Sequence, residues 1–194
     1  MHSPSIKGML FMSTVLLTPT HIACDHTVVF QTHPTVAKII PKPTKMFIPK
    51  HRRFAVLTVG NYDPKQINTP VVFSALEDIL TRLIKAFELT GDTSFPLKPS
   101  DTVNTFLKTF DPTAKTFLVT KEYRFVLHTN KQKDFVDATV CDDFVGSGSG
   151  GMFGVGLLVG GMAITDIWET LHGIDPLTSV KHTIVEIASL NDWI

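Results

Sequence analysis

The sequence predicts an α+β fold in which antiparallel sheets pack against helices. The main observation is the order of the elements: strand-like runs come in two blocks, and each block is followed by two segments with helical spacing. This order argues against a doubly wound sheet, in which strands and helices alternate. The second observation is that 194 residues with 43% hydrophobic content fit one domain with a sizeable core.

The first block of strands opens with a hairpin. Two β-branched, half-apolar runs, 13–18 and 21–30, are separated by Pro19 and Thr20, which are typical of a tight turn. A basic loop punctuated by prolines follows. The runs "KMFIP" and "RRFAVLTVG" then predict two more strands, the last ending at Gly60.

Two helices are predicted next. Thr69 and Pro70 supply an N-cap and a first-turn proline, and apolar residues then recur at helical spacing up to Gly91. Ser100 and Asp101 cap a second, shorter helix that runs through Phe110.

The second half repeats this order. "TFLVTK" and "YRFVLHT" predict a hairpin, and "DFVDATVCDDFVG" predicts one or two strands. The apolar segment 152–171 is expected to be a buried helix. Asp175 and Pro176 are expected to start a final helix with one apolar face, made of Val180, Ile184, Ile187 and Ala188.

Charge and cysteine content narrow the class of protein. Eighteen basic and eighteen acidic residues cancel, so we expect neither a nucleic acid nor a membrane partner. The basic run between Asp25 and Asp63 predicts a solvated face, with phosphate binding as the alternative. Cys24 and Cys141 have neither metal-ligand spacing nor a disulfide framework, which favours a reducing, cytoplasmic location without metal or other cofactor. The N-terminal residues lack the pattern of a secretory signal.

The stretch "DFVGSGSGGMFGVG", residues 143–156, allows two interpretations. Gly146, Gly148 and Gly151 satisfy the G-x-G-x-x-G pattern of dinucleotide sites. Such a site needs a βαβ unit with further alternating strands, and here a strand block precedes the glycines. The alternative is a tight corner, where backbone approaches backbone. This corner also resembles the G-S-G-G turn of proteasome-type peptidases, with Ser149 as its serine.

The start of the chain resembles the same family, the proteasome β subunits and HslV. Ser13 and Thr14 open the first strand, and "IACD" ends at Asp25. The segment "KPTKMFIPKHRRFAVLTVG" then places Lys45 fifteen residues before Gly60. The resemblance covers about residues 13–194 and lies in the order of elements and in sparse motifs.

The resemblance implies an N-terminal nucleophile hydrolase with a four-layer αββα sandwich. Residues 13–194 would form the domain, and residues 1–12 a propeptide or N-terminal extension. Such subunits usually assemble into rings, so it also implies a homo-oligomer, a peptide or unfolded protein substrate and an ATPase partner. The first residue's hydroxyl attacks a peptide carbonyl and its own α-amine takes the proton. Carried over to this sequence, the resemblance would make Ser13 the nucleophile, with Thr14 as the alternative. Asp25 and Lys45 would be a charged pair. Gly60 would face the oxyanion, and Ser149 would form a hydrogen bond with the amine.

The sequence departs from the family in three places. Twelve residues precede Ser13, and Met12 stands where relatives usually have a glycine. The chain ends at "NDWI", where active relatives continue and carry another Asp and Ser of the site, so we expect this supporting shell to be missing. A second hypothesis is therefore a catalytically inactive structural or assembly protein of the same fold. A weaker third is nucleotide binding at the glycine turn.

Overall fold

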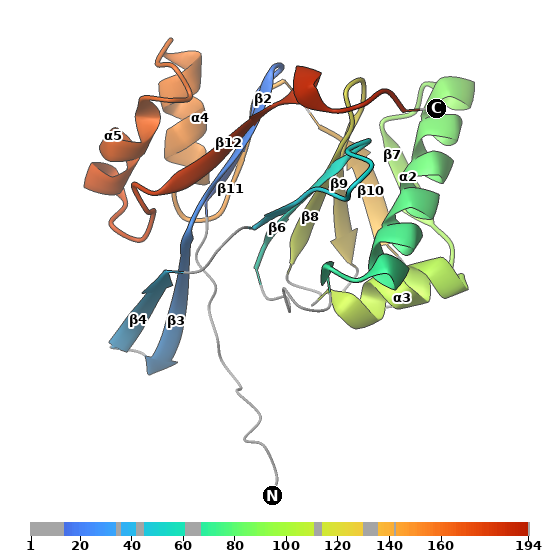
Figure 1. The fold of residues 1–194 in the computed structure, drawn as a ribbon, viewed down its shortest axis with the longest axis horizontal. Coiled ribbons are helices and arrows are strands. Elements are labelled where there is room, and N and C mark those ends of the chain that lie inside the picture. Colours follow the sequence, from blue (N-terminus) through green and yellow to red (C-terminus); the bar gives the residue numbers. More distant parts are fainter. Residues whose placement is uncertain are drawn as a thin grey trace, which may run out of the picture.

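The computed structural model describes residues 14–33, 36–41, 45–60, 67–110, 114–129, 136–141 and 143–193. Two antiparallel sheets and helices on either side of them make up an α+β sandwich, as the sequence predicted (Figure 1). Within these residues, no helix combines the length and the apolar character needed to cross a membrane.

The first sheet contains the start of the chain. Its strands run in the order β11-β1-β2-β12, and every pair is antiparallel. The strands are β1 (Val15–Leu17), β2 (His21–Asp25), β11 (Val145–Ser147) and β12 (His182–Glu186). The predicted first hairpin is confirmed, since the Thr18 N–H donates to the His21 carbonyl at 2.9 Å across the turn. Strand β2 ends at Asp25, which places this residue at the edge of the turn into the next strand.

The second sheet has the order β5-β6-β8-β9-β10-β7. Its strands are β5 (Met46–Phe47), β6 (Ala55–Val59), β7 (Ser94–Leu97), β8 (Lys115–Val119), β9 (Arg124–Thr129) and β10 (Val136–Val140). The sequence pattern missed β7, because its four residues include a proline, and proline at an edge strand removes the usual signal. The run 21–30, predicted as one strand, is split between β2 and β3 (Thr27–His33), which belong to different sheets. Strand β3 forms a separate hairpin with β4 (Val36–Pro41), which lies in the region expected to be a loop.

Two helices cover the second sheet where the caps predicted them. Helix α2 (Pro70–Thr90) starts after Thr69, whose hydroxyl accepts a hydrogen bond from the Val72 N–H at 3.4 Å. Helix α3 (Asp101–Thr109) starts after Ser100, whose hydroxyl accepts from the Val103 N–H at 3.2 Å.

The segment after the glycine corner is two helices and not one buried helix. Helix α4 (Gly151–Val159) ends at Gly160, and α5 (Ile167–Ile174) follows after a turn. Gly161 has φ 91°, a left-handed conformation that ends the helical path. The prediction of burial was also wrong, since Met152 on α4 is 78% exposed. Composition shows that a helix is apolar but not whether another element covers it.

The predicted final helix is a strand followed by a short turn of 3₁₀-helix. Residues His182–Glu186 form β12, and Ile187–Ser189 form the 3₁₀ turn. Thr183, Ile184 and Val185 are β-branched and suit a strand, and β2 offers an edge to pair with. Pairing with β2 therefore outweighed the helical spacing of the apolar residues.

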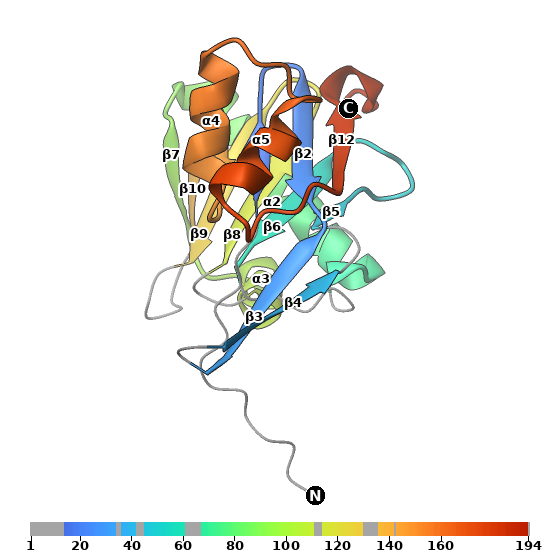
Figure 2. The same ribbon diagram turned by 90° about the vertical axis from the view of Figure 1, so that its left-hand side faces the viewer.

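The elements stack in four layers, seen edge-on in Figure 1 and from the side of α4 and α5 in Figure 2. Helices α4 and α5 cover the first sheet, around a cluster that includes Leu16 and Trp168. The space between the sheets is filled by residues such as Val15 and Leu57. Helices α2 and α3 cover the second sheet over the largest cluster. The observed order is the αββα sandwich that the resemblance implied.

The corner between β11 and α4 gives a test of the packing. A Cβ on Gly146 would lie 2.1 Å from the Gly151 carbonyl oxygen, whereas a Cβ on Gly156 would meet no atom within 4 Å. We expect Gly146→Ala to lower the free energy of unfolding by about 3 kcal/mol through overpacking. The control Gly156→Ala should raise it by about 0.5 kcal/mol, because alanine favours the helix. Chemical denaturation measures both, and equal stabilities would contradict this packing.

Candidate active site

Thr14 directly precedes strand β1 and is fully buried. Its N–H donates to Asp25 Oδ1 at 2.9 Å, and the Asp25 N–H donates to the Thr14 carbonyl at 3.0 Å. The antiparallel pairing of β1 and β2 therefore fixes the end of β2 opposite the start of β1. Because Ser13 precedes Thr14, the nitrogen that faces Asp25 in the full chain is a peptide nitrogen.

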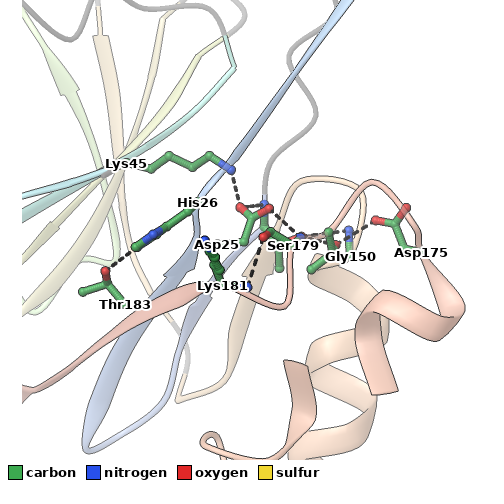
Figure 3. A network of polar contacts seen from close by, with 10 residues as sticks. Asp25, His26, Lys45, Gly150, Asp175, Ser179, Lys181 and Thr183 are labelled. Carbon is green, nitrogen blue, oxygen red and sulfur yellow. Dashed lines mark hydrogen bonds and ion pairs between the residues drawn. The ribbon is translucent and has the colours of Figure 1, made fainter. Parts of the chain in front are cut away.

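Asp25 and Lys45 form a buried ion pair. The Lys45 ammonium donates to Asp25 Oδ1. Lys45 is 2% exposed and Asp25 is 0% exposed. Burial lowers the pKa of Lys45, and the nearby Asp25 carboxylate partly opposes this. The Ser179 N–H donates to Asp25 Oδ2 at 3.1 Å, so both carboxylate oxygens are engaged (Figure 3). The predicted charged pair is therefore assembled beside Thr14.

The hydroxyl of Thr14 belongs to a directed chain of hydrogen bonds. Thr178 Oγ1 lies 2.7 Å from Thr14 Oγ1 and donates to Asp175 Oδ2 at 2.9 Å. Because Thr178 gives its proton to the carboxylate, it must accept the proton of the Thr14 hydroxyl. The Gly150 N–H donates to Thr14 Oγ1 from another side at 3.2 Å. The Thr14 hydroxyl is thus oriented by groups from two loops.

Asp175 and Thr178 were missed as site residues, and the expectation that a supporting shell is missing was wrong. The sequence analysis read Asp175 and Pro176 as the start of a helix. In the structure they form a turn, in which Leu177 and Thr178 hydrogen-bond to the side chain of Asp175. The signal that could have found them is the spacing Asp-x-x-Thr after the last helix.

The glycine stretch serves as a close-approach corner beside Thr14. A Cβ on Gly150 would lie 2.3 Å from Thr178 Oγ1 and 2.6 Å from Thr14 Oγ1, so only glycine fits there. The strand before the corner, β11, pairs with β1 in an antiparallel sheet, which is not the βαβ setting of a dinucleotide loop.

The remaining predicted residues have different outcomes. Ser13 lies outside the described residues, so its proposed role as nucleophile stays a prediction. Ser149 precedes Gly150, and its Oγ is buried without a hydrogen-bond partner in the described part of the chain. Gly60 directly follows β6, whose Thr58 N–H donates to the Lys45 carbonyl at 3.0 Å. Its role toward an oxyanion stays a prediction.

Cys24 directly precedes Asp25 in the sequence but is a poor nucleophile. It is fully buried, and burial raises the pKa of its thiol to about 11. The thiol therefore stays protonated at neutral pH. Among the described residues, no three His, Cys, Asp or Glu side chains gather in a way that could hold a metal ion.

The interaction between Asp25 and Lys45 can be tested through the free energy of unfolding. We expect Asp25→Ala to lower the free energy of unfolding by about 3–5 kcal/mol, because it leaves a buried ammonium without its partner. Adding Lys45→Met removes that charge and should restore part of the loss. Urea denaturation of the two single variants and the double variant measures the coupling. Additive losses would contradict a direct interaction.

The chain is similar to known proteins in its fold. A scan against protein-family models gave no match, and neither did a search of curated proteins. Among solved structures, HslV from Trypanosoma brucei matches with 12% sequence identity and a TM-score of 0.50, covering 89% of this chain and 98% of HslV. BPH of Thiobacillus denitrificans, solved in complex with epoxomicin, matches with 8% identity and a TM-score of 0.47, covering 91% of this chain and 98% of BPH. The chain has a divergent HslV/proteasome-like fold.

Proposed function

We propose that the chain is a threonine-type N-terminal nucleophile peptidase that hydrolyses peptide bonds within a ring assembly. The observation that carries the proposal is the environment of Thr14. Its hydroxyl is oriented by Thr178 and Gly150, and its nitrogen faces the buried pair of Asp25 and Lys45. These contacts favour Thr14 over Ser13 as the nucleophile.

Activation of such a site requires cleavage of the peptide bond between Ser13 and Thr14. Thr14 Oγ1 would attack the Ser13 carbonyl carbon, forming a C–O bond as the C–N bond breaks. The hydroxyl proton passes to the departing nitrogen, and the product is an ester. Water then hydrolyses this ester, which releases residues 1–13 as a carboxylic acid and leaves Thr14 with a free amine.

In the processed form the amine would serve as general base for its own hydroxyl. An α-amine has a pKa near 8, which suits proton transfer at neutral pH. The positive charge of Lys45 lowers that pKa by repulsion, while Asp25 holds the lysine in place. The Ser149 Oγ is buried and has no hydrogen-bond partner among the described residues, and in the proposal it would accept a hydrogen bond from the amine. Attack by Thr14 Oγ1 on a substrate carbonyl then forms an acyl ester as the peptide C–N bond breaks, and the departing amine takes the proton that the α-amine had received. Water hydrolyses the ester and releases the acyl part as a carboxylic acid.

The mass of the N-terminus of the purified native protein tests this proposal. We expect wild-type protein to begin at Thr14, and Thr14→Ala to keep residues 1–13 because it has no attacking hydroxyl. Thr14→Ser should still process, since serine supplies the same hydroxyl. A peptide β-lactone should add one acyl group to processed wild type.

The matched control for this test is Ser13→Ala, which should leave cleavage before Thr14 unchanged. A mature chain that begins at Ser13, and loses this start in Ser13→Ala, would move the nucleophile to Ser13. The domain would then be residues 13–194, as the sequence analysis expected.

The alternative is a catalytically inactive structural or assembly protein of the same fold. The observation that favours it is the residue before Thr14: relatives place glycine before the nucleophile, and this chain has serine, with methionine before that. A side chain before the scissile bond restricts the backbone conformations that allow attack. An assembled particle with intact Met1 and no inhibitor adduct would establish this alternative.

Assembly into a homo-oligomer is supported by the exposed face of α4. Met152, Phe153 and Val159 are 78%, 51% and 69% exposed, and no charged residue occurs between Phe144 and Thr165. Contiguous exposed apolar surface of this kind marks interaction sites. We include in the proposal a cytoplasmic particle that receives unfolded protein from an ATPase partner.

A charge on α4 tests the assembly. We expect Phe153→Glu to shift the native mass toward that of one chain, because it puts a carboxylate into an apolar contact. The control is Glu169→Gln on the neighbouring helix, which is also exposed and should leave the mass unchanged. Light scattering coupled to size-exclusion chromatography measures both. An unchanged oligomer in Phe153→Glu would rule out this face.

A further inference from the structure

We propose that His172 is a positioning residue for the reaction, acting through the peptide group between Thr178 and Ser179. The inference rests on the proposed peptidase function and adds a residue to it. His172 lies in the last turn of α5 and is exposed, and the hydrogen bond given for its ring goes to the Thr178 carbonyl.

The contact of His172 has a defined direction. Its Nδ1 lies 2.7 Å from the carbonyl oxygen of Thr178. A backbone carbonyl only accepts hydrogen bonds, so Nδ1 must carry a proton and donate it. This requires either the Nδ1–H tautomer or the imidazolium, and both make the same hydrogen bond.

The other end of the same peptide group reaches the buried ion pair. The Ser179 N–H donates to Asp25 Oδ2 at 3.1 Å (Figure 3). The peptide unit is planar, so its carbonyl and N–H turn together. When His172 fixes the carbonyl, it also aims the N–H at the carboxylate that holds Lys45 and the Thr14 nitrogen.

The side chain of Thr178 extends the effect to the nucleophile. Thr178 carries both the carbonyl that His172 holds and the hydroxyl that lies 2.7 Å from Thr14 Oγ1. The Asp175 side chain fixes the turn before this peptide, through Leu177 N–H at 3.1 Å. The Ser179 hydroxyl fixes the turn after it, by accepting from the Lys181 N–H at 3.1 Å. His172 thus restrains the plane of the peptide between these two anchors.

Three variants of the full-length protein test the role of His172. His172→Ala removes the donor, His172→Asn places an amide N–H at a similar distance from the backbone, and Thr170→Ala is a control at an exposed site on the same helix. Each is measured for native mass, thermal unfolding, N-terminal mass, and kcat and KM on a fluorogenic peptide. We expect His172→Ala to lower kcat about fivefold to tenfold with KM unchanged. His172→Asn should recover most of the loss, and Thr170→Ala should match wild type.

The outcomes separate this inference from the function on which it rests. Active wild type with an equally active His172→Ala would overturn the role of His172 and leave the peptidase proposal intact. A loss in His172→Ala that His172→Asn does not recover, or that comes as a rise in KM, would also overturn it. Unprocessed, inactive wild type would instead overturn the proposed function itself.

Discussion

The buried pair of Asp25 and Lys45 is the interaction on which the rest of this site depends. Taking two charges out of water costs several kcal/mol per ion, and a buried pair of this kind often contributes little net stability. Here the cost is offset by contacts that use both oxygens of Asp25, from Lys45, the Thr14 N–H and the Ser179 N–H. The pair therefore joins the starts of β1 and β5 to the loop before β12, which no apolar pair could do with the same directionality.

That cost argues for a chemical role. A lysine whose pKa is lowered by burial, held by a carboxylate that also accepts from the Thr14 N–H, is the kind of perturbed group that gathers at active sites. The glycine corner supports the same conclusion. Gly150 brings a backbone N–H to within 3.2 Å of Thr14 Oγ1, and any larger residue would collide with the two threonine hydroxyls.

Sequence patterns predicted the features that local chemistry determines. Thr69 and Ser100 predicted two helix starts, the turn at Pro19 predicted the first hairpin, and Asp25 and Lys45 were identified through the resemblance. The patterns failed where pairing between distant segments determines the secondary structure. The β-branched residues of β12 form a strand because they pair with the edge of β2. Asp175 and Thr178 were hidden for the same reason: their role depends on a turn that the false helix removed.

The hydrogen bonds around Thr14 also bear on the choice between an active and an inert protein. In the full chain, Asp25 accepts from the peptide N–H of Thr14, and the same oxygen could accept from an ammonium or amine at that position after cleavage. Under the proposed function, the charged pair, the corner and the Thr178 hydroxyl would serve the processed site from the positions that they hold in the full chain. The active and the inert protein would then differ in whether the bond before Thr14 is cleaved. A serine before that bond, in place of glycine, would affect the rate of cleavage through the backbone conformations that it allows.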